Sequence, residues 1–142
     1  MTRIGVLQMT SGVDPEANLA VIENAAKQCA NQGALMLFTP EMSLLLDRDR
    51  ARAREWIESD APADMIERIS TIAAKQQHDI VVGSMPVAAG GGRWANRSHY
   101  FRPDLAPPIT YDKIHMFDVE VGALGSQVAV KIVQPISPNL TA

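Results

Sequence analysis

The chain has 142 residues, of which 46% are hydrophobic and 20% charged, so it has the length of one domain and can bury a core. A disordered protein would be poorer in apolar residues, and the composition excludes that class. The formal net charge of -3 gives no indication of nucleic-acid binding, which requires a basic surface. The arginine-rich run at 48–55 has acidic residues between its arginines, which favours a solvated helix face or loop.

Membrane insertion and export are not indicated by the sequence. The apolar run at 4–7 is too short for a secretory signal, and no other stretch is long enough to span a membrane. The single cysteine, Cys29, cannot form an internal disulfide, so nothing points to an oxidising compartment. We therefore expect a cytoplasmic protein with no membrane or nucleic-acid partner.

The first third of the chain predicts a strand, a helix and a second strand. Residues 3–9 have the pattern of a buried strand. Asp14 is suited to cap a helix that has Pro15 at its first position, and Gly33 can supply the left-handed residue that ends it. The apolar run at 34–38 is expected to be a strand covered on both faces. This order predicts a right-handed crossover between two parallel strands.

The middle of the chain is less regular. Residues 42–58 are expected to be helical in part, and a clearer helix is predicted to begin at Ala61. A third strand is predicted at 80–85 and is expected to end at Pro86. His78, just before this strand, has no partner at metal-ligand spacing and is interpreted as a surface residue.

Two further strands are predicted to pair as a hairpin. Residues 94–101 alternate in the manner of a strand, and a turn at 102–104 leads to a second strand at 109–113. Residues 128–133 could form one more strand, whereas the prolines and polar residues after it are typical of an unstructured tail. The elements together indicate an α/β fold.

Two charged residues at strand ends are candidates for a functional site. Glu41 follows the apolar run that Pro40 interrupts, and ligands of open α/β sheets bind beyond the carboxyl ends of the strands. The alternative is a loop carboxylate that caps the following segment. Lys113 follows the last hairpin strand and can point into a site. The alternative is a lysine that only keeps a strand end soluble, which is the commoner role.

Three segments, in this order, resemble the nitrilase superfamily of carbon-nitrogen hydrolases: residues 37–41 (Leu-Phe-Thr-Pro-Glu), 96–101 (Asn-Arg-Ser-His-Tyr-Phe) and 111–118 (Tyr-Asp-Lys-Ile-His-Met-Phe-Asp). The resemblance covers residues 1–121. It implies a nitrilase-like α-β-β-α sandwich, present here as an incomplete half with a mixed sheet flanked by helices. Residues 1–121 are then a partial carbon-nitrogen hydrolase domain, and residues 122–142 are a divergent C-terminal tail.

The same resemblance implies roles for the two candidate residues. Hydrolysis of an amide or nitrile through an acyl-enzyme needs a nucleophile, a base that activates it and a group that stabilises the oxyanion. Glu41 matches the general base of the family and Lys113 the stabiliser of the tetrahedral intermediate, and no metal or cofactor is implied. In the family the nucleophile is a cysteine downstream of the lysine, but no cysteine follows Lys113 in this chain. Cys29 is expected on the buried stripe of the first helix, where a lone cysteine is more often an inert core residue.

We therefore expect a truncated or frame-shifted copy, or a fragment, that is inactive alone. The implied substrate is a small-molecule amide, as in the small-amidase branch that acts on ω-amides or deaminated glutathione-like compounds. An exposed apolar face and homo-oligomerisation are also expected, with residues 42–77 as a possible contact region.

Two other hypotheses and one departure from the family pattern remain open at this point. The chain could be a non-catalytic module that associates with, or regulates, an intact relative. It could also be an unrelated doubly wound α/β binding domain, in which Glu41 and Lys113 would not lie close together. In the family a glycine usually follows the Pro-Asp pair of the hairpin turn, whereas Leu105 stands here, so a residue is missing or the turn is of another type.

Overall fold

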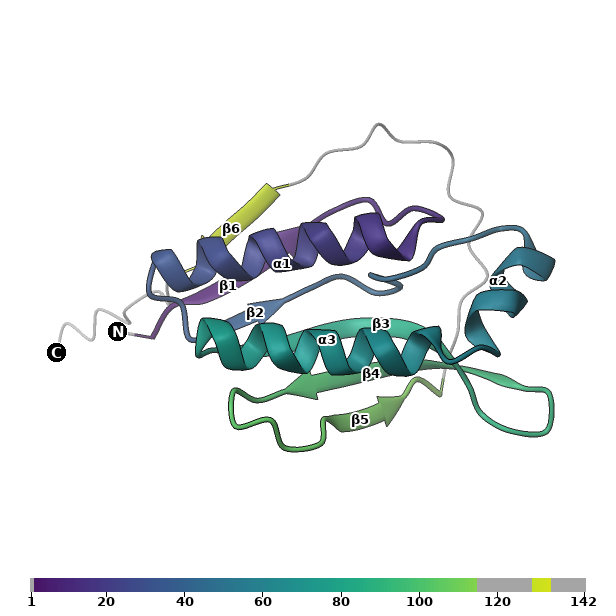
Figure 1. Cartoon of the computed structure of the whole chain (residues 1–142). Coiled ribbons are helices and arrows are strands. Elements are labelled where there is room, and N and C mark those ends of the chain that lie inside the picture. The colour runs from purple at the N-terminus through teal and green to yellow at the C-terminus, as the bar shows by residue number, and fades with distance from the viewer. Residues whose placement is uncertain (1, 115–128, 134–142) are drawn as a thin grey trace, which may run out of the picture.

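The computed structural model describes residues 2–114 and 129–133, and these residues form three helices and six strands. Figure 1 shows one mixed sheet with helices packed on it. In chain order the elements are β1 (Ile4–Gln8), α1 (Pro15–Asn31), β2 (Met36–Phe38), α2 (Arg50–Ile57), α3 (Ala61–Gln76), β3 (Asp79–Ala88), β4 (Trp94–Phe101), β5 (Ile109–Asp112) and β6 (Ala129–Val133).

The strands are ordered β5-β4-β3-β2-β1-β6 across the sheet. β2 is parallel to both of its neighbours, β1 and β3, which confirms the predicted parallel pairing of the first two strands. β4 is antiparallel to both β3 and β5, which confirms the predicted hairpin. The strand predicted at 128–133 is present as β6, antiparallel to β1. The carboxyl ends of β1, β2, β3 and β5 therefore lie along one edge of the sheet.

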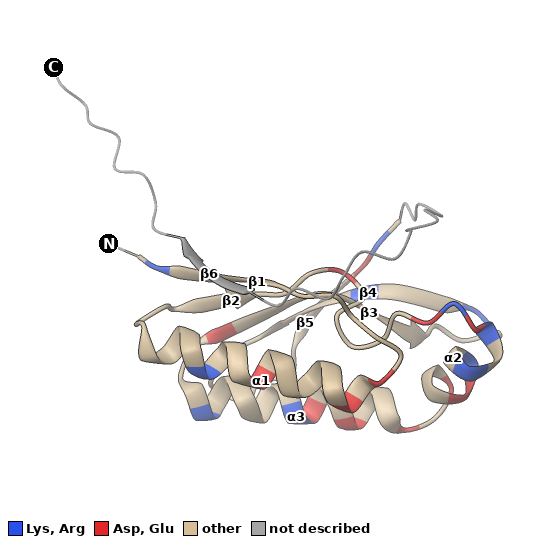
Figure 2. Cartoon of the chain, turned by 90° about the horizontal axis from the view of Figure 1, so that it is seen from above, with Lys and Arg blue, Asp and Glu red and all other residues tan. Residues whose placement is uncertain are grey.

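The core lies between the sheet and two helices. α1 and α3 lie side by side on one face of the sheet (Figures 1 and 2). Alternate strand residues point toward these helices, because side chains of a strand alternate between the two faces. The largest buried apolar side chains of this layer include Leu37, Ile80 and Phe101 from the strands and Ile22 and Ile69 from the helices.

The opposite face of the sheet is not covered by any described element (Figure 2). Val6, Ile109 and Tyr111 are exposed there, and the neighbouring Phe38 is only half-buried. Among the described residues, β2 is therefore covered on one face, not on both as its apolar run predicts. A mixed sheet with helices on one side agrees with one half of the predicted α-β-β-α sandwich.

The ends of α1 follow from local hydrogen bonding, as the sequence predicts. The Asp14 carboxylate accepts the backbone N–H groups of Glu16 at 3.0 Å and Ala17 at 3.2 Å. These donors have no partner within the helix, so the cap stabilises its first turn. At the other end Gly33 has φ 68°, the left-handed conformation that glycine adopts readily.

Two expectations for the segment around β3 are wrong. The strand does not stop at Pro86 but continues to Ala88, because a bulge between Val82 and Met85 interrupts the ladder just before the proline and proline is tolerated at such an irregularity. His78 is not a surface residue, since its exposed fraction is 3%. Its backbone N–H donates to the Ala73 carbonyl at 3.4 Å, and the turn that ends α3 folds its ring inward.

The turn between β4 and β5 keeps the backbone form that a glycine normally supplies. Leu105 has φ 59°, and the preceding Asp104 carboxylate accepts the Ala106 N–H at 3.0 Å. The left-handed region places the side chain of an ordinary residue too close to its own backbone, which costs about 1–2 kcal/mol. The departure from the family pattern is therefore a strained leucine at the usual glycine position.

His99 of β4 is an ionisable group enclosed in the core. Its exposed fraction is 2%, and its ring stacks on Phe101 with centroids 5.8 Å apart. Within the described residues, its Nδ1 atom has no hydrogen-bond partner. Burial, with a smaller contribution from the Arg97 charge, lowers the pKa of His99 to about 4. The imidazole is therefore neutral in the folded chain at neutral pH.

Replacing Leu105 by glycine is expected to raise the free energy of unfolding by about 0.5–1 kcal/mol, since relief of the left-handed strain outweighs the added chain entropy of glycine. Leu35→Gly is the matched control, because Leu35 is 60% exposed against 61% for Leu105 but is not in the left-handed region. That variant is expected to be destabilised. Urea unfolding of both variants measures the difference, and equal losses of stability would contradict the strain at Leu105.

Acidification from pH 6.5 to pH 4 is expected to destabilise the wild-type chain more than His99→Phe. In the unfolded chain His99 binds a proton below its ordinary pKa of 6.5, whereas the folded chain leaves it neutral down to about pH 4. The contribution of His99 to the free energy of unfolding is thus complete above pH 6.5. It is lost as the pH falls, by about 3 kcal/mol in all. Urea unfolding at pH 7, 5.5 and 4.5 measures this difference. Parallel pH profiles for the two proteins would contradict it.

Candidate active site

Glu41 lies in a tight loop at the carboxyl end of β2. The loop runs along β3, where the Thr39 N–H donates to the Val81 carbonyl at 2.9 Å and the Ser43 N–H donates to the Ser84 carbonyl at 3.0 Å. These bonds hold both ends of the loop on the neighbouring strand. Glu41 lies between them, and 67% of its side chain is exposed.

Buried hydroxyl groups fix the path of this loop. The Thr39 and Ser43 hydroxyls share a hydrogen bond of 2.6 Å, and Ser43 also donates to the Pro40 carbonyl. The Ser84 hydroxyl accepts the Met42 N–H at 2.9 Å. Met42 has φ 52°, an unfavourable conformation for a residue with a side chain, and the surrounding bonds hold it there. The residue beside Glu41 is therefore held in one conformation.

Gly83, in the bulge of β3, permits the loop to approach the strand. A Cβ atom on Gly83 would lie 2.5 Å from the Thr39 carbonyl oxygen and 2.6 Å from that of Pro40. Both are backbone atoms, so neither can move aside as a flexible side chain would. The Ser98 hydroxyl of β4 donates to the Gly83 carbonyl at 2.6 Å and anchors the bulge from the other side.

Lys113 follows β5 and reaches the same place from another part of the chain. Its backbone N–H donates to the Asn96 carbonyl at 2.9 Å, which continues the pairing of β5 with β4 by one residue. Its ammonium forms an ion pair with the Glu41 carboxylate, 72 residues away in the sequence. The Lys113 side chain is 30% exposed. This contact contradicts the hypothesis of an unrelated α/β domain, which requires the two residues to be separated.

A second ion pair joins β4 and β5, and its acidic member, Asp112, directly precedes Lys113. The Arg97 guanidinium donates to both carboxylate oxygens of Asp112, at 2.5 and 2.9 Å. The Asp112 carboxylate raises the pKa of Arg97, and the Arg97 guanidinium holds the pKa of Asp112 below its usual value. Both groups therefore stay charged across the neutral range.

The thiol of Cys29 does not belong to this arrangement. Cys29 is fully buried on α1, where it packs against Gly5 of β1 on the helix-covered face of the sheet. Burial raises the pKa of the thiol, which disfavours the nucleophilic thiolate. Within residues 2–114 and 129–133 there is also no group of three or more His, Cys, Asp or Glu residues suited to hold a metal ion.

The site therefore places a carboxylate and an ammonium in contact at the carboxyl edge of a mixed α/β sheet. Residues 3–134 match the family model described as carbon-nitrogen hydrolase. This match spans most of the chain, so the protein belongs to the carbon-nitrogen hydrolase family. No helix in the described parts of the chain is long and apolar enough to cross a membrane.

Most of the similar curated proteins are named amidases. The chain is 32% identical over 120 residues to the deaminated glutathione amidase of Yersinia enterocolitica, covering 83% of this chain and 41% of that protein. It is 29% identical over 119 residues to the omega-amidase of Danio rerio, covering 84% and 42%. A hydrolase of Mycobacterium tuberculosis is 30% identical over 149 aligned positions, covering 98% and 51%. The chain spans about half the length of the curated relatives it matches.

Solved structures of amidases have the same fold. An amidase from Nesterenkonia sp. matches with a TM-score of 0.71 at 24% identity, covering 83% of this chain and 44% of that one. A mutant of the Nesterenkonia AN1 amidase, described as a member of the nitrilase superfamily, matches with a TM-score of 0.72 at 23% identity, covering 83% and 45%. These matches confirm the predicted nitrilase-like fold.

The boundary predicted at Val121 is not tested by the described residues, because residues 115–128 lie outside them. The family match continues to residue 134, beyond that boundary. The division into a partial domain at 1–121 and a divergent tail at 122–142 stays a prediction.

The sequence reasoning missed two parts of the site. One is the hydroxyl network of Thr39, Ser43 and Ser84, and the other is the pair of Arg97 and Asp112. The small residues Gly83 and Ser84 in the otherwise apolar run of β3 were the available signal for the first. The second depends on strand register, which alternation alone does not determine.

Gly83→Ala is expected to lower the free energy of unfolding by about 1–3 kcal/mol, because the new methyl group meets backbone atoms of the Glu41 loop. Gly12→Ala is the matched control: its Cβ would have its nearest neighbour at 3.9 Å, the Asn18 side-chain oxygen. Thermal unfolding of both variants measures the difference. A Gly83→Ala protein as stable as Gly12→Ala would show that the close approach does not hold the loop.

Proposed function

We propose that this chain supplies the general base and the oxyanion-stabilising group of a carbon-nitrogen hydrolase, with Glu41 as the base and Lys113 as the stabiliser. The observation behind the proposal is the contact between the Glu41 carboxylate and the Lys113 ammonium, which come from loops 72 residues apart. Membership of the carbon-nitrogen hydrolase family supports the same roles.

The chemistry needs both groups beside one reacting carbonyl. A nucleophile attacks the carbonyl carbon of the amide while a carboxylate takes the proton of the nucleophile. Negative charge then develops on the carbonyl oxygen, where an ammonium lowers the energy of the tetrahedral intermediate. When the carbon-nitrogen bond breaks, the protonated carboxyl returns its proton to the leaving amine. Glu41 and Lys113 have the charges that these steps require.

We assign no nucleophile among the residues of this chain. The family resemblance implies a cysteine, and the one cysteine here is the buried Cys29. We therefore propose that these 142 residues alone do not hydrolyse amides.

The proposed substrate is a small-molecule amide, with a nitrile as the related alternative. Relatives at about 30% identity are named deaminated glutathione amidase and omega-amidase, which favours the terminal carboxamide of a small acid. Because the similar curated proteins are named as hydrolases and amidases, a purely non-catalytic module is not the function that we favour.

Location and self-association complete the proposal. The cytoplasmic location expected from the sequence stays a prediction.

Homo-oligomerisation is supported by the apolar residues that no described element covers, such as Ile109 and Tyr111. A sedimentation coefficient that stays at the monomer value as the concentration rises would count against it.

A chimera tests the two roles. In the Yersinia enterocolitica amidase, the part that matches residues 1–114 of this chain is replaced by those residues, and ammonia release from amide substrates is measured. The chimera is expected to hydrolyse the amide, and Glu41→Gln and Lys113→Met are each expected to lower kcat at least about a hundredfold, the usual effect of losing a general base or an oxyanion-stabilising group.

Two exposed residues on α3 provide controls for this experiment. Glu67→Gln and Lys75→Met make the same chemical changes away from the site and are expected to leave kcat unchanged. The unfused chain is expected to release no ammonia. A folded chimera that keeps its kcat after Glu41→Gln or Lys113→Met would refute the assigned role, and activity of the unfused chain that is lost on alkylation of Cys29 would refute the missing nucleophile.

A further inference from the structure

Burial places only a weak constraint on the register of β5, the strand that directly precedes Lys113. β5 has four residues, Ile109–Asp112, and all four are exposed. It lies at the edge of the described sheet, with β4 as its neighbour. Strand register is normally set by the need to bury one face, and this constraint is nearly absent in β5.

Register nevertheless decides where Lys113 points. In the observed pairing Tyr111 lies opposite Ser98, and the Lys113 N–H bonds to the Asn96 carbonyl one step further on. Since side chains alternate along a strand, Lys113 lies on the same face as Tyr111. A slip of one residue would turn every side chain of β5 to the other face and would separate Lys113 from Glu41.

The ion pair of Arg97 and Asp112 distinguishes the observed register from a slipped one. The two residues are directly opposite each other on β4 and β5, and both guanidinium bonds are made, at 2.5 and 2.9 Å. A bidentate pair has a fixed geometry, so it is lost when Asp112 moves by one position. Backbone hydrogen bonds do not make this distinction, because every residue of a strand offers the same donor and acceptor.

We propose that Arg97 and Asp112 are positioning residues that set the register of β5 and thereby bring Lys113 to Glu41. This inference rests on the proposed function of the Glu41–Lys113 pair. Neither Arg97 nor Asp112 is assigned a contact with substrate. Their effect is exerted through the backbone that ends in Lys113.

Zero-length coupling of carboxylate to amine tests the proposal in the whole 142-residue chain. A water-soluble carbodiimide joins Glu41 to Lys113 when the two side chains touch, and peptide mass spectrometry quantifies the joined peptides. Arg97→Gln and Asp112→Asn are each expected to lower the yield, by up to about fivefold, the equilibrium shift given by a cross-strand charged pair at the upper end of the usual range. The exchanged pair Arg97→Asp with Asp112→Arg is expected to restore more than half of the yield.

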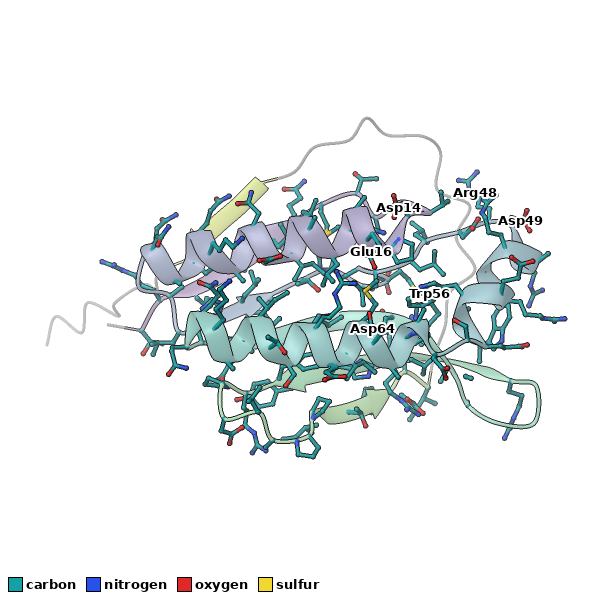
Figure 3. The ribbon with its side chains drawn as sticks, in the orientation of Figure 1. Asp14, Glu16, Arg48, Asp49, Trp56 and Asp64 are labelled. Carbon is teal, nitrogen blue, oxygen red and sulfur yellow. The ribbon has the colours of Figure 1, made fainter. Side chains whose placement is uncertain are left out.

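Arg68→Gln is the matched control. Arg68 donates to both carboxylate oxygens of Glu16, at 2.6 and 2.8 Å, so its loss removes a similar ion pair from another part of the molecule. Figure 3 shows Glu16 and Asp64, the two acidic partners of Arg68, near the amino ends of α1 and α3. This variant is expected to keep the wild-type coupling yield.

The outcomes distinguish a failure of the positioning role from a failure of the proposed function. One outcome is that the wild-type chain couples and that Arg97→Gln and Asp112→Asn give the same yield. It would overturn the positioning role and leave the proposed function standing. Folded single variants with low yields and no recovery in the exchanged pair would also overturn it. A wild-type chain in which Glu41 and Lys113 do not couple would contradict both proposals. Circular dichroism of each variant establishes that it is folded.

Discussion

The site depends on the close approach of the loop at 39–43 to the bulge of β3. Gly83 makes this approach sterically possible, and the Ser84 hydroxyl and carbonyl bind two successive backbone N–H groups of the loop. If either residue had an apolar side chain of ordinary size, the loop would have to move outward and Glu41 with it. The position of the proposed base is thus determined by a neighbouring strand and not by the loop's own sequence. A small polar residue in the middle of a strand has this role because it offers hydrogen bonds where the regular ladder is broken.

Much of the fold could be predicted from the sequence because its local signals agree with its tertiary structure. The capping by Asp14, the left-handed Gly33 and the alternation at 94–101 each determine an element whose boundaries differ little from the prediction. The errors occur where tertiary contacts override local preference. Pro86 remains within a strand because the preceding bulge has already disturbed the pairing, and His78 is buried because the end of α3 turns it inward.

The candidate site was predictable only through the family resemblance and only in part. Glu41 and Lys113 are ordinary charged residues at strand ends, and nothing in their local sequence says that they touch. Their contact requires that β2 and β5 run in the same direction, so that their carboxyl ends lie at the same edge of the sheet. Two strands, β3 and β4, lie between them. The hydroxyl network and the Arg97–Asp112 pair depend on register and on a bulge, and these are properties of paired strands that one strand's sequence does not contain.

The pairing of β6 with β1 determines at which edge of the sheet the last described strand ends. Val133 lies opposite Ile4, at the amino end of β1, whereas Glu41 follows the carboxyl end of β2. The start of the first strand and the end of the last described strand are therefore neighbours, at the edge of the sheet remote from the Glu41–Lys113 pair. β6 therefore runs from the edge of the sheet that carries the pair toward the opposite edge, in the reverse direction to β1 and β2.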